Sequence, residues 1–242
     1  MFGKNRKIRK NSRASFWRRG FLLLLLALLL VTGLEVFVFG SVRPPLTVAA
    51  ARARMALLLG REVFFQPQSW VSLQEISPHL RRAVLASEDQ RFLRHRGFDF
   101  IELGLALQAL QEGGALRGAS TISMQTARTL FLWPARSWWR KFAEAYYTLL
   151  LELVWSKEKI LEFYLNSVDW GPGVCGVEAA ALKYFHCHAR ALDADQSALL
   201  AAVLPGPHLW RPDRPNDAVK RRVARIRQEM GKVPLVGEAP SM

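Results

Sequence analysis

The chain has 242 residues, of which 50% are hydrophobic and 22% are charged. This length suffices for an N-terminal segment followed by one domain of roughly 200 residues with a sizeable core. The formal net charge of +14 invites nucleic-acid binding as a function. However, eight basic residues precede the first acidic one and only +6 remains for the rest of the chain, so the distribution of charge argues against a nucleic-acid partner.

An apolar run of twenty residues, 21–40, follows a basic tail at 1–20. As a helix this run is about 30 Å long, which matches the hydrocarbon core of a bilayer. The basic flank predicts a cytoplasmic N-terminus, and hence a single-pass protein of the inner membrane with its remaining chain on the periplasmic, extracytoplasmic side. The alternative is a cleaved signal peptide, but the run is longer than a signal core and the small residues at 49–51 lie too far beyond it.

Hydrophobic spacing, capping residues and Gly or Pro breaks predict a mostly α-helical domain over 41–232, followed by a short tail at 233–242. There is no βαβ alternation, internal repeat or phosphate-binding loop in the sequence. An extended segment, a glycine-rich loop and a turn are expected at 62–72, 113–118 and 170–173, respectively. The expected helices, in chain order, are 48–59, 78–96, 100–112, 120–132, 137–155, 157–166, 177–185, 194–204 and 219–230.

The second of these helices carries the first candidate for chemistry. It is expected to begin at the N-cap Ser77 and to stop at Gly97. An apolar stripe with a spacing of four residues runs from Leu80 to Phe92 and contains Glu88, which places a carboxylate on a buried face. Because burying an unpaired ion is costly, Glu88 is either a structural residue paired with a buried arginine or a general base whose pKa is raised toward neutrality by desolvation.

Three further groups carry polar side chains that suit catalysis. The segment 118–125 places small hydroxyl residues and Gln125 at an expected helix start, where free N–H groups favour an anion; ordinary capping is the alternative. Several cations gather in one region and suit a pyrophosphate, unless they form a solvated face or contact lipid headgroups. Glu144 lies at helical spacing from two of these cations, so a helix ion pair is its simplest role. The cations are Arg128, Arg136, Arg140 and Lys141.

Two other pairs of residues are expected to serve the structure. Tyr164 and Asn166 are expected to hold the loop that follows them. Cys175 and Cys187 have no metal-ligand spacing with the histidines, and they either form a disulfide or remain free buried thiols.

Glu88 and Glu144, placed among cations, suggest an acid and base acting on a glycosidic bond. The spacing alone leaves open whether that bond is made or broken.

The sequence resembles the peptidoglycan glycosyltransferases, and closest to it are the monofunctional members with one membrane anchor and no transpeptidase domain. Five motifs occur in the family's order over about residues 50–210. Residues 88–97 are similar to E-D-x-x-F-x-x-H-x-G, residues 118–129 to G-x-S-T-I-T-Q-Q-x-x-K-N, and residues 140–144 to R-K-x-x-E. Residues 160–166 are similar to I-L-E-x-Y-L-N, and residues 173–185 to G-x-x-G-x-x-x-A-A-x-x-Y-F.

This resemblance implies a lysozyme-like large lobe and a smaller jaw lobe, here near 98–118, that dips into the bilayer. It implies an enzyme that polymerises lipid II. Glu88 would deprotonate the 4-hydroxyl of the incoming lipid II, whose oxygen attacks the anomeric carbon of the growing chain with inversion, so that undecaprenyl diphosphate leaves. Arg128, Arg136 and Lys141 would neutralise the departing charge.

The resemblance leaves three roles open for Glu144: orienting the cations, binding a divalent cation such as Mg²⁺ or Mn²⁺, or assisting the leaving group. No organic cofactor is implied. The implied partners are lipid II, lipid-linked glycan, the membrane and proteins of cell-wall synthesis or division. The resemblance assigns substrate binding to further motif residues, namely Asp89, Phe92, His95, Gly97, Ser120, Thr121, Gln125 and Arg140.

Three positions depart from the family pattern. Met124 stands where the family has the first of two glutamines, Arg128 replaces a lysine, and Thr129 replaces an asparagine. Met124 is the best argument for one alternative, a catalytically silent membrane scaffold for the cell-wall machinery. A second alternative is a lytic lysozyme-like enzyme, which would also use a glutamate of raised pKa. The cation cluster favours synthesis over lysis, because hydrolysis of a glycan releases no pyrophosphate.

Overall fold

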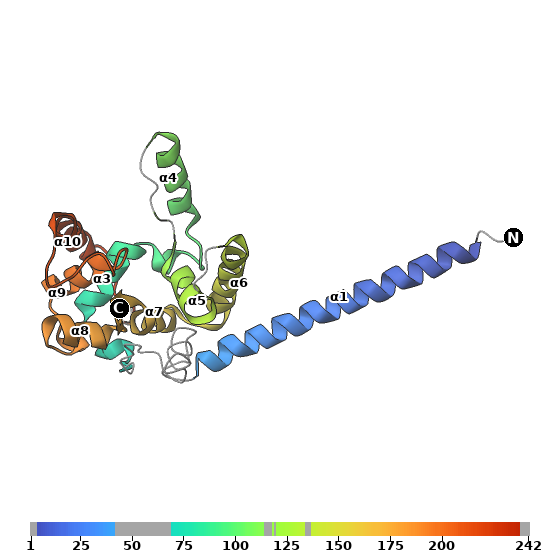
Figure 1. The fold of residues 1–242 in the computed structure, drawn as a ribbon, viewed down its shortest axis with the longest axis horizontal. Coiled ribbons are helices and arrows are strands. Elements are labelled where there is room, and N and C mark those ends of the chain that lie inside the picture. The colour runs from blue at the N-terminus through green and yellow to red at the C-terminus, as the bar shows by residue number, and fades with distance from the viewer. Residues whose placement is uncertain (1–3, 42–68, 114–117, 119, 134–136, 238–242) are drawn as a thin grey trace, which may run out of the picture. The chain divides into compact units, whose positions relative to one another are not determined.

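The computed structural model describes residues 4–41, 69–113, 118, 120–133 and 137–237. The chain divides into two units, Met1–Val42 and Arg43–Met242. Each is described by itself. Helices make up most of the described chain, as the hydrophobic spacing predicts (Figure 1).

The first unit consists of one helix, α1 (Lys4–Phe39). Its stretch Phe16–Phe39 has 24 residues and a mean hydropathy of 2.8, and it is long and apolar enough to cross a membrane. The leucine side chains of this stretch are exposed, as suits a helix that faces lipid. The helix therefore fits the single-pass anchor that the sequence predicts.

The second unit holds the remaining elements. In chain order they are η1 (Leu73–Glu75), α3 (Pro78–Glu88), η2 (Phe92–Arg94), α4 (Phe100–Gln111), α5 (Ile122–Phe131), α6 (Trp138–Val154), α7 (Lys157–Ser167), β1 (Asp169–Gly171), β2 (Val174–Cys175), α8 (Val177–Phe185), η3 (Ala189–Ala191), α9 (Ala194–Val203) and α10 (Asp217–Met230).

Local sequence sets where these helices begin. Ser77, Ser137 and Ser156 each accept a hydrogen bond from a backbone N–H in the first turn of α3, α6 and α7. Asp193 caps α9 and forms a capping box with Gln196. Asp193 therefore determines where α9 begins.

The core is arranged around α7, whose residues from Ile160 to Ser167 are all buried. Helix α5 packs against both α6 and α7, while α3 packs against α9 and α10. Figure 1 shows α4 projecting from this group of helices. The turn expected at 170–173 joins β1 and β2, which pair antiparallel with Asp169 opposite Cys175. Both cysteines are free thiols.

The helix that was expected to reach Gly97 is shorter than predicted, because α3 ends at Glu88. Asp89 leaves the helical conformation with φ −162° and ψ 75°, and the 3₁₀ turn η2 follows. Gly97 does require glycine, since its φ is +88° and an added Cβ would lie 2.8 Å from Cγ2 of Thr148. It serves a loop packed against α6, however, and does not end a helix.

Some predicted elements cannot be compared with the structure, and one predicted segment packs on the domain. The helix expected at 48–59, most of the extended segment at 62–72 and most of the glycine-rich loop at 113–118 lie outside the described residues. The described start of the tail at 233–242 packs on the domain, because Val236 is 1% exposed and its carbonyl accepts a hydrogen bond from Arg81 Nη1 at 2.9 Å.

Candidate active site

Glu88 lies half-buried at the C-terminal end of α3, and each of its carboxylate oxygens is held by a different neighbour. Gln125 on α5 donates from Nε2 to Oε2 at 3.1 Å. The hydroxyl of Ser87 can donate to two acceptors, Oε1 of Glu88 at 3.1 Å and the carbonyl oxygen of Ala201 at 3.2 Å. Among the described residues, the direct hydrogen-bond donors of this carboxylate are neutral, and the charge of the half-buried Arg222 acts on it as well.

A first relay fixes the amide of Gln125. The hydroxyl of Tyr164 on α7 donates to Gln125 Oε1 at 3.2 Å, so the amide nitrogen is the end that faces Glu88. Burial raises the pKa of Tyr164 well above its ordinary value, and the negative charge of Glu88 raises it further. The phenol therefore remains a donor at neutral pH.

A second relay reaches Glu88 from α10. Arg222 donates from Nη2 to Ser87 Oγ at 3.2 Å and from Nε to the carbonyl of Ala202 at 3.1 Å. Since Arg222 fills a lone pair of the hydroxyl, the single proton of Ser87 is left to donate to Glu88 or to Ala201. Burial lowers the pKa of Arg222, whereas the negative charge of Glu88 opposes that shift.

A pocket of about 90 Å³ opens beside Glu88. Its walls combine carboxylates, hydroxyls and one guanidinium, a set of groups that can bind the hydroxyls of a sugar through hydrogen bonds. The pocket brings Glu88, Asp89, Ser120 and Thr121 together, as the motifs predict. Asp99, Glu102 and Arg225 also contribute to its lining.

A second charged cluster lies at the start of α6. The carboxylate of Glu144 is fully buried, with Oε2 at 3.1 Å from Arg140 Nη1 and Oε1 at 2.6 Å from Lys141 Nζ. These are the ion pairs that the helical spacing predicts. Both oxygens of Glu144 are therefore ion-paired, while the side chain of Lys141 remains 46% exposed and available to an anion.

Helix α5 connects the two clusters. It carries Gln125, which contacts Glu88, and it packs against α6, which carries Glu144. Arg128 on α5 is half-buried and close enough to Tyr164 to influence its pKa. Arg136 lies outside the described residues.

Comparison with known proteins decides the family. Residues 60–231 match the protein family described as Transglycosylase. The chain belongs to the transglycosylase family. The predicted fold class is thereby confirmed, because the transglycosylase domain is lysozyme-like, mostly helical and preceded here by one long apolar helix.

Many relatives carry the name "Biosynthetic peptidoglycan transglycosylase". One from Pseudomonas fluorescens (strain SBW25) is 46% identical over 200 residues, which cover 83% of either chain. Another, from Rhodospirillum centenum, is 49% identical over 179 residues, covering 74% of this chain and 78% of its own. A third, from Chromohalobacter salexigens, is 46% identical over 222 residues, covering 88% of this chain and 92% of its own.

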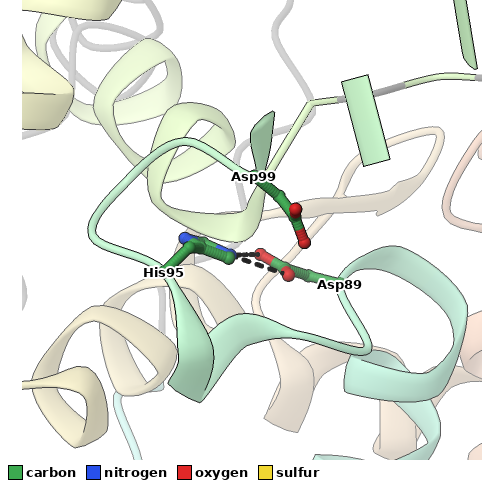
Figure 2. Close-up of side chains that lie close together, drawn as sticks. All are labelled: Asp89, His95 and Asp99. Carbon is green, nitrogen blue, oxygen red and sulfur yellow. Dashed lines mark hydrogen bonds and ion pairs between the residues drawn. The ribbon is translucent and has the colours of Figure 1, made fainter. Parts of the chain in front are cut away.

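The transglycosylase also gathers three buried side chains around the loop after α3 (Figure 2). Nε2 of His95 lies 3.0 and 3.1 Å from the two carboxylate oxygens of Asp89, and Asp89 Oδ2 accepts a hydrogen bond from the N–H of Ile122 at the start of α5. Asp99 caps α4 through Oδ1, and its Oδ2 lies 3.0 Å from Nε of Arg91. One ligand atom from each of Asp89, His95 and Asp99 lies within 4.8 Å of the others.

Several motif residues have structural partners in the transglycosylase. Phe92 is 1% exposed and lies 4.4 Å below the ammonium of Lys157. Thr121 Oγ1 donates to the carbonyl of Gly97 at 2.6 Å and accepts from the N–H of Met124, so it caps α5. These contacts hold the loop that carries Asp89 and His95. Direct contact with the substrate stays a prediction for four of these residues, namely Phe92, His95, Gly97 and Thr121.

The residue at the first departure from the family pattern is buried. Met124 is 8% exposed, whereas its neighbour Gln125 reaches Glu88. Thr129 donates from Oγ1 to the carbonyl of Gln125 at 2.9 Å. The amide that contacts the candidate base is therefore present despite the substitution.

The relays to Glu88 could not be found from the sequence. Ser87 is a small residue next to a motif, and Arg222 lies on a C-terminal helix without a motif of its own. Tyr164 was expected to hold a loop, and its contact with Gln125 depends on the packing of α5 against α7. The sequence pointed to Gln125 as a site residue, both through the polar segment 118–125 and through the family motif, but not to its contact with Glu88.

Proposed function

We propose that this transglycosylase polymerises the glycan strands of peptidoglycan, transferring the growing lipid-linked glycan onto the 4-hydroxyl of lipid II with release of undecaprenyl diphosphate. The observation that carries the proposal is a pair of sites that α5 connects: the carboxylate at the end of α3, held at a pocket of sugar-binding groups, and the cluster of fixed cations on α6. The names of the relatives support the choice of substrate.

Glu88 is the general base of this reaction. Its carboxylate takes the proton of the 4-hydroxyl as the oxygen forms a bond to the anomeric carbon of the donor. The bond from that carbon to the diphosphate oxygen breaks at the same time, and the leaving group departs with the bonding electrons from the opposite face, which inverts the anomeric centre. Ser87 and Gln125 keep the carboxylate oriented toward the pocket.

The cations stabilise the diphosphate as its charge develops. Lys141 and Arg140 are oriented by Glu144, so they are in place before the leaving group forms. Arg128 and Arg136 complete the cation set. Ser120 and Gln125 bind the donor sugar from the start of α5.

A divalent cation, if the reaction uses one, is held by Asp89, His95 and Asp99. Oδ2 of Asp99 is buried and lies 3.0 Å from Nε of Arg91, so a bound cation would take the place of that ion pair. Two carboxylates and an imidazole suit Mn²⁺ better than Mg²⁺. Such an ion would tie the start of α4 to the start of α5. Mn²⁺ paramagnetic resonance of the chain and of Asp99→Asn tests this assignment, since binding should be lost in the variant.

The apolar helix α1 supports a location of the reaction at the membrane. We propose that α1 spans the inner membrane with its N-terminus in the cytoplasm, and that the catalytic domain faces the periplasm, where lipid-linked substrates and proteins of the cell-wall machinery meet it. Labelling of cysteines introduced before and after α1 by a membrane-impermeant reagent tests the orientation.

Polymerisation of purified lipid II by the full chain in detergent tests the proposed reaction. Growth of long glycan from lipid II supports it. Cleavage of preformed glycan without growth would favour the lytic enzyme, and the absence of either activity would favour the silent scaffold.

A further inference from the structure

Helix α6 presents two opposite faces. One face is buried and contains Glu144, Thr148 and Leu151. The other face is apolar but strongly exposed: Trp138 is 82%, Trp139 80% and Leu153 79% exposed. Phe142 and Leu149 are exposed as well.

The exposed side chains form a continuous stripe. At 100° per residue, positions 138, 142, 149 and 153 fall within about 60° of one another on the helix, opposite Glu144. The stripe extends for about 22 Å along the axis. Figure 1 shows α6 lying beside α5, with which it buries its other face. A soluble surface rarely exposes so many large apolar side chains together, so this stripe is an interaction surface.

We propose that this stripe, the α6 stripe, docks on the lipid bilayer and lies in its interfacial region. Its occupant is a membrane because its chemistry is that of an interfacial helix: tryptophans occur together at one end, aliphatic side chains follow, and a cation flanks the stripe. That cation is Lys141, whose side chain is 46% exposed and complements anionic lipid headgroups, whereas Arg140 lies on the face of Glu144.

Two other features of the chain favour lipid as the occupant. The apolar stretch Phe16–Phe39 fits an anchor that keeps the domain close to a bilayer. Helix α4 also exposes apolar side chains, among them Phe100, Ile101 and Leu105. Helix α4 lies in the jaw expected near 98–118, and the α6 stripe is a second apolar surface, separate from it.

Docking has a consequence that rests on the proposed function. The tryptophans Trp138 and Trp139 directly precede Arg140 and Lys141 at the start of α6. Tryptophan prefers the depth of the headgroups, so docking holds the start of α6, with the exposed ammonium of Lys141, at the level where the diphosphate of a lipid-linked substrate lies. The stripe thus aligns the cation cluster with the leaving group before the sugar reacts.

Photocrosslinking in the full chain tests the docking without requiring turnover. A photoreactive benzoylphenylalanine replaces Leu149 or Leu153 in protein reconstituted into vesicles of phosphatidylethanolamine and phosphatidylglycerol. Leu209, which is 83% exposed in the segment between α9 and α10, is the matched control position. We expect lipid adducts several-fold more abundant at 149 and 153 than at 209. Equal adducts at all three positions, or adducts to α1 or to a second copy in place of lipid, would overturn the proposal.

A paired activity measurement tests the consequence. Leu149→Glu combined with Leu153→Glu should lower the rate of lipid II polymerisation in vesicles by roughly tenfold relative to Leu209→Glu, and the loss should largely disappear in detergent micelles. Equal rates for both variants in vesicles would overturn the link between docking and catalysis. If the unaltered chain itself polymerises nothing, the proposed function fails while the lipid adducts still decide the docking.

Discussion

The side-chain amide of Gln125 lies with its nitrogen 3.1 Å from Oε2 of Glu88. Its direction is set by Tyr164, which donates to the oxygen of the same amide. The carboxylate that is proposed as the base is therefore held by a donor whose own orientation is fixed from the core. Its other oxygen is reached by Ser87, which is in turn held by Arg222.

Replacing Tyr164 by phenylalanine should disturb the base without removing it. In Tyr164→Phe the amide of Gln125 loses the contact that fixes it, and kcat/KM should fall roughly tenfold, which corresponds to about 1.4 kcal/mol. Because burial and the charge of Glu88 raise the pKa of Tyr164, its own titration does not contribute near neutral pH. An unchanged kcat/KM in the variant would show that the relay does not orient Glu88.

The relay from α10 is tested by a double-mutant cycle. Arg222→Gln should lower kcat/KM several-fold, about 1 kcal/mol, and the same change should have little further effect once Ser87→Ala has removed the intervening hydroxyl. Arg221→Gln is the matched control, because Arg221 is exposed on the same helix. Additive effects of Arg222→Gln and Ser87→Ala would mean that the two residues act independently.

Gly97 should be intolerant of a side chain. Gly97→Ala should lower the free energy of unfolding by about 1–3 kcal/mol, because its φ of +88° is strained for alanine and the added Cβ meets Thr148 at 2.8 Å. Gly231→Ala is a matched control, since no atom lies within 4 Å of its Cβ position and its φ is −71°. Urea unfolding of the two variants measures the difference, and equal stabilities would contradict the packing described for the loop.

Restoring the family's glutamine at position 124 should not raise activity. Met124 is 8% exposed, so Met124→Gln buries an amide and should cost about 1–3 kcal/mol of stability. The rate per folded molecule should hold, because Gln125 already supplies the amide at Glu88. Met124→Leu, which conserves volume, is the control for packing. A clear gain in rate for Met124→Gln would show that position 124 faces the donor substrate.

The helices were predictable wherever local chemistry decided them. Ser137, Ser156 and Asp193 begin their helices as their side chains predict, because a cap acts within one turn. The end of α3 was not predictable in this way. The helix stops at Glu88 because Asp89 is bound by His95 and by the N–H of Ile122, and these partners come from other parts of the fold.

At the candidate site, too, local contacts were predictable and contacts between distant parts of the chain were not. Spacing along one helix was enough to predict that Glu144 pairs with Arg140 and Lys141. No spacing predicts that Arg222 reaches Ser87, since the packing of α10 against α3 brings the two together. The exposure of the α6 stripe was also missed, because an apolar helix has the same composition whether it faces the core or a membrane.

The role of Glu88 is tested most directly by polymerisation of purified lipid II with the full chain and with Glu88→Gln, which keeps the shape of the side chain but cannot accept the proton. Glu158→Gln, at an exposed position on α7, is the matched control. We expect long glycan from the unaltered chain and the control, and a loss of at least roughly 100-fold in Glu88→Gln, as removal of a general base produces. Equal amounts of glycan from Glu88→Gln and the unaltered chain would contradict the account.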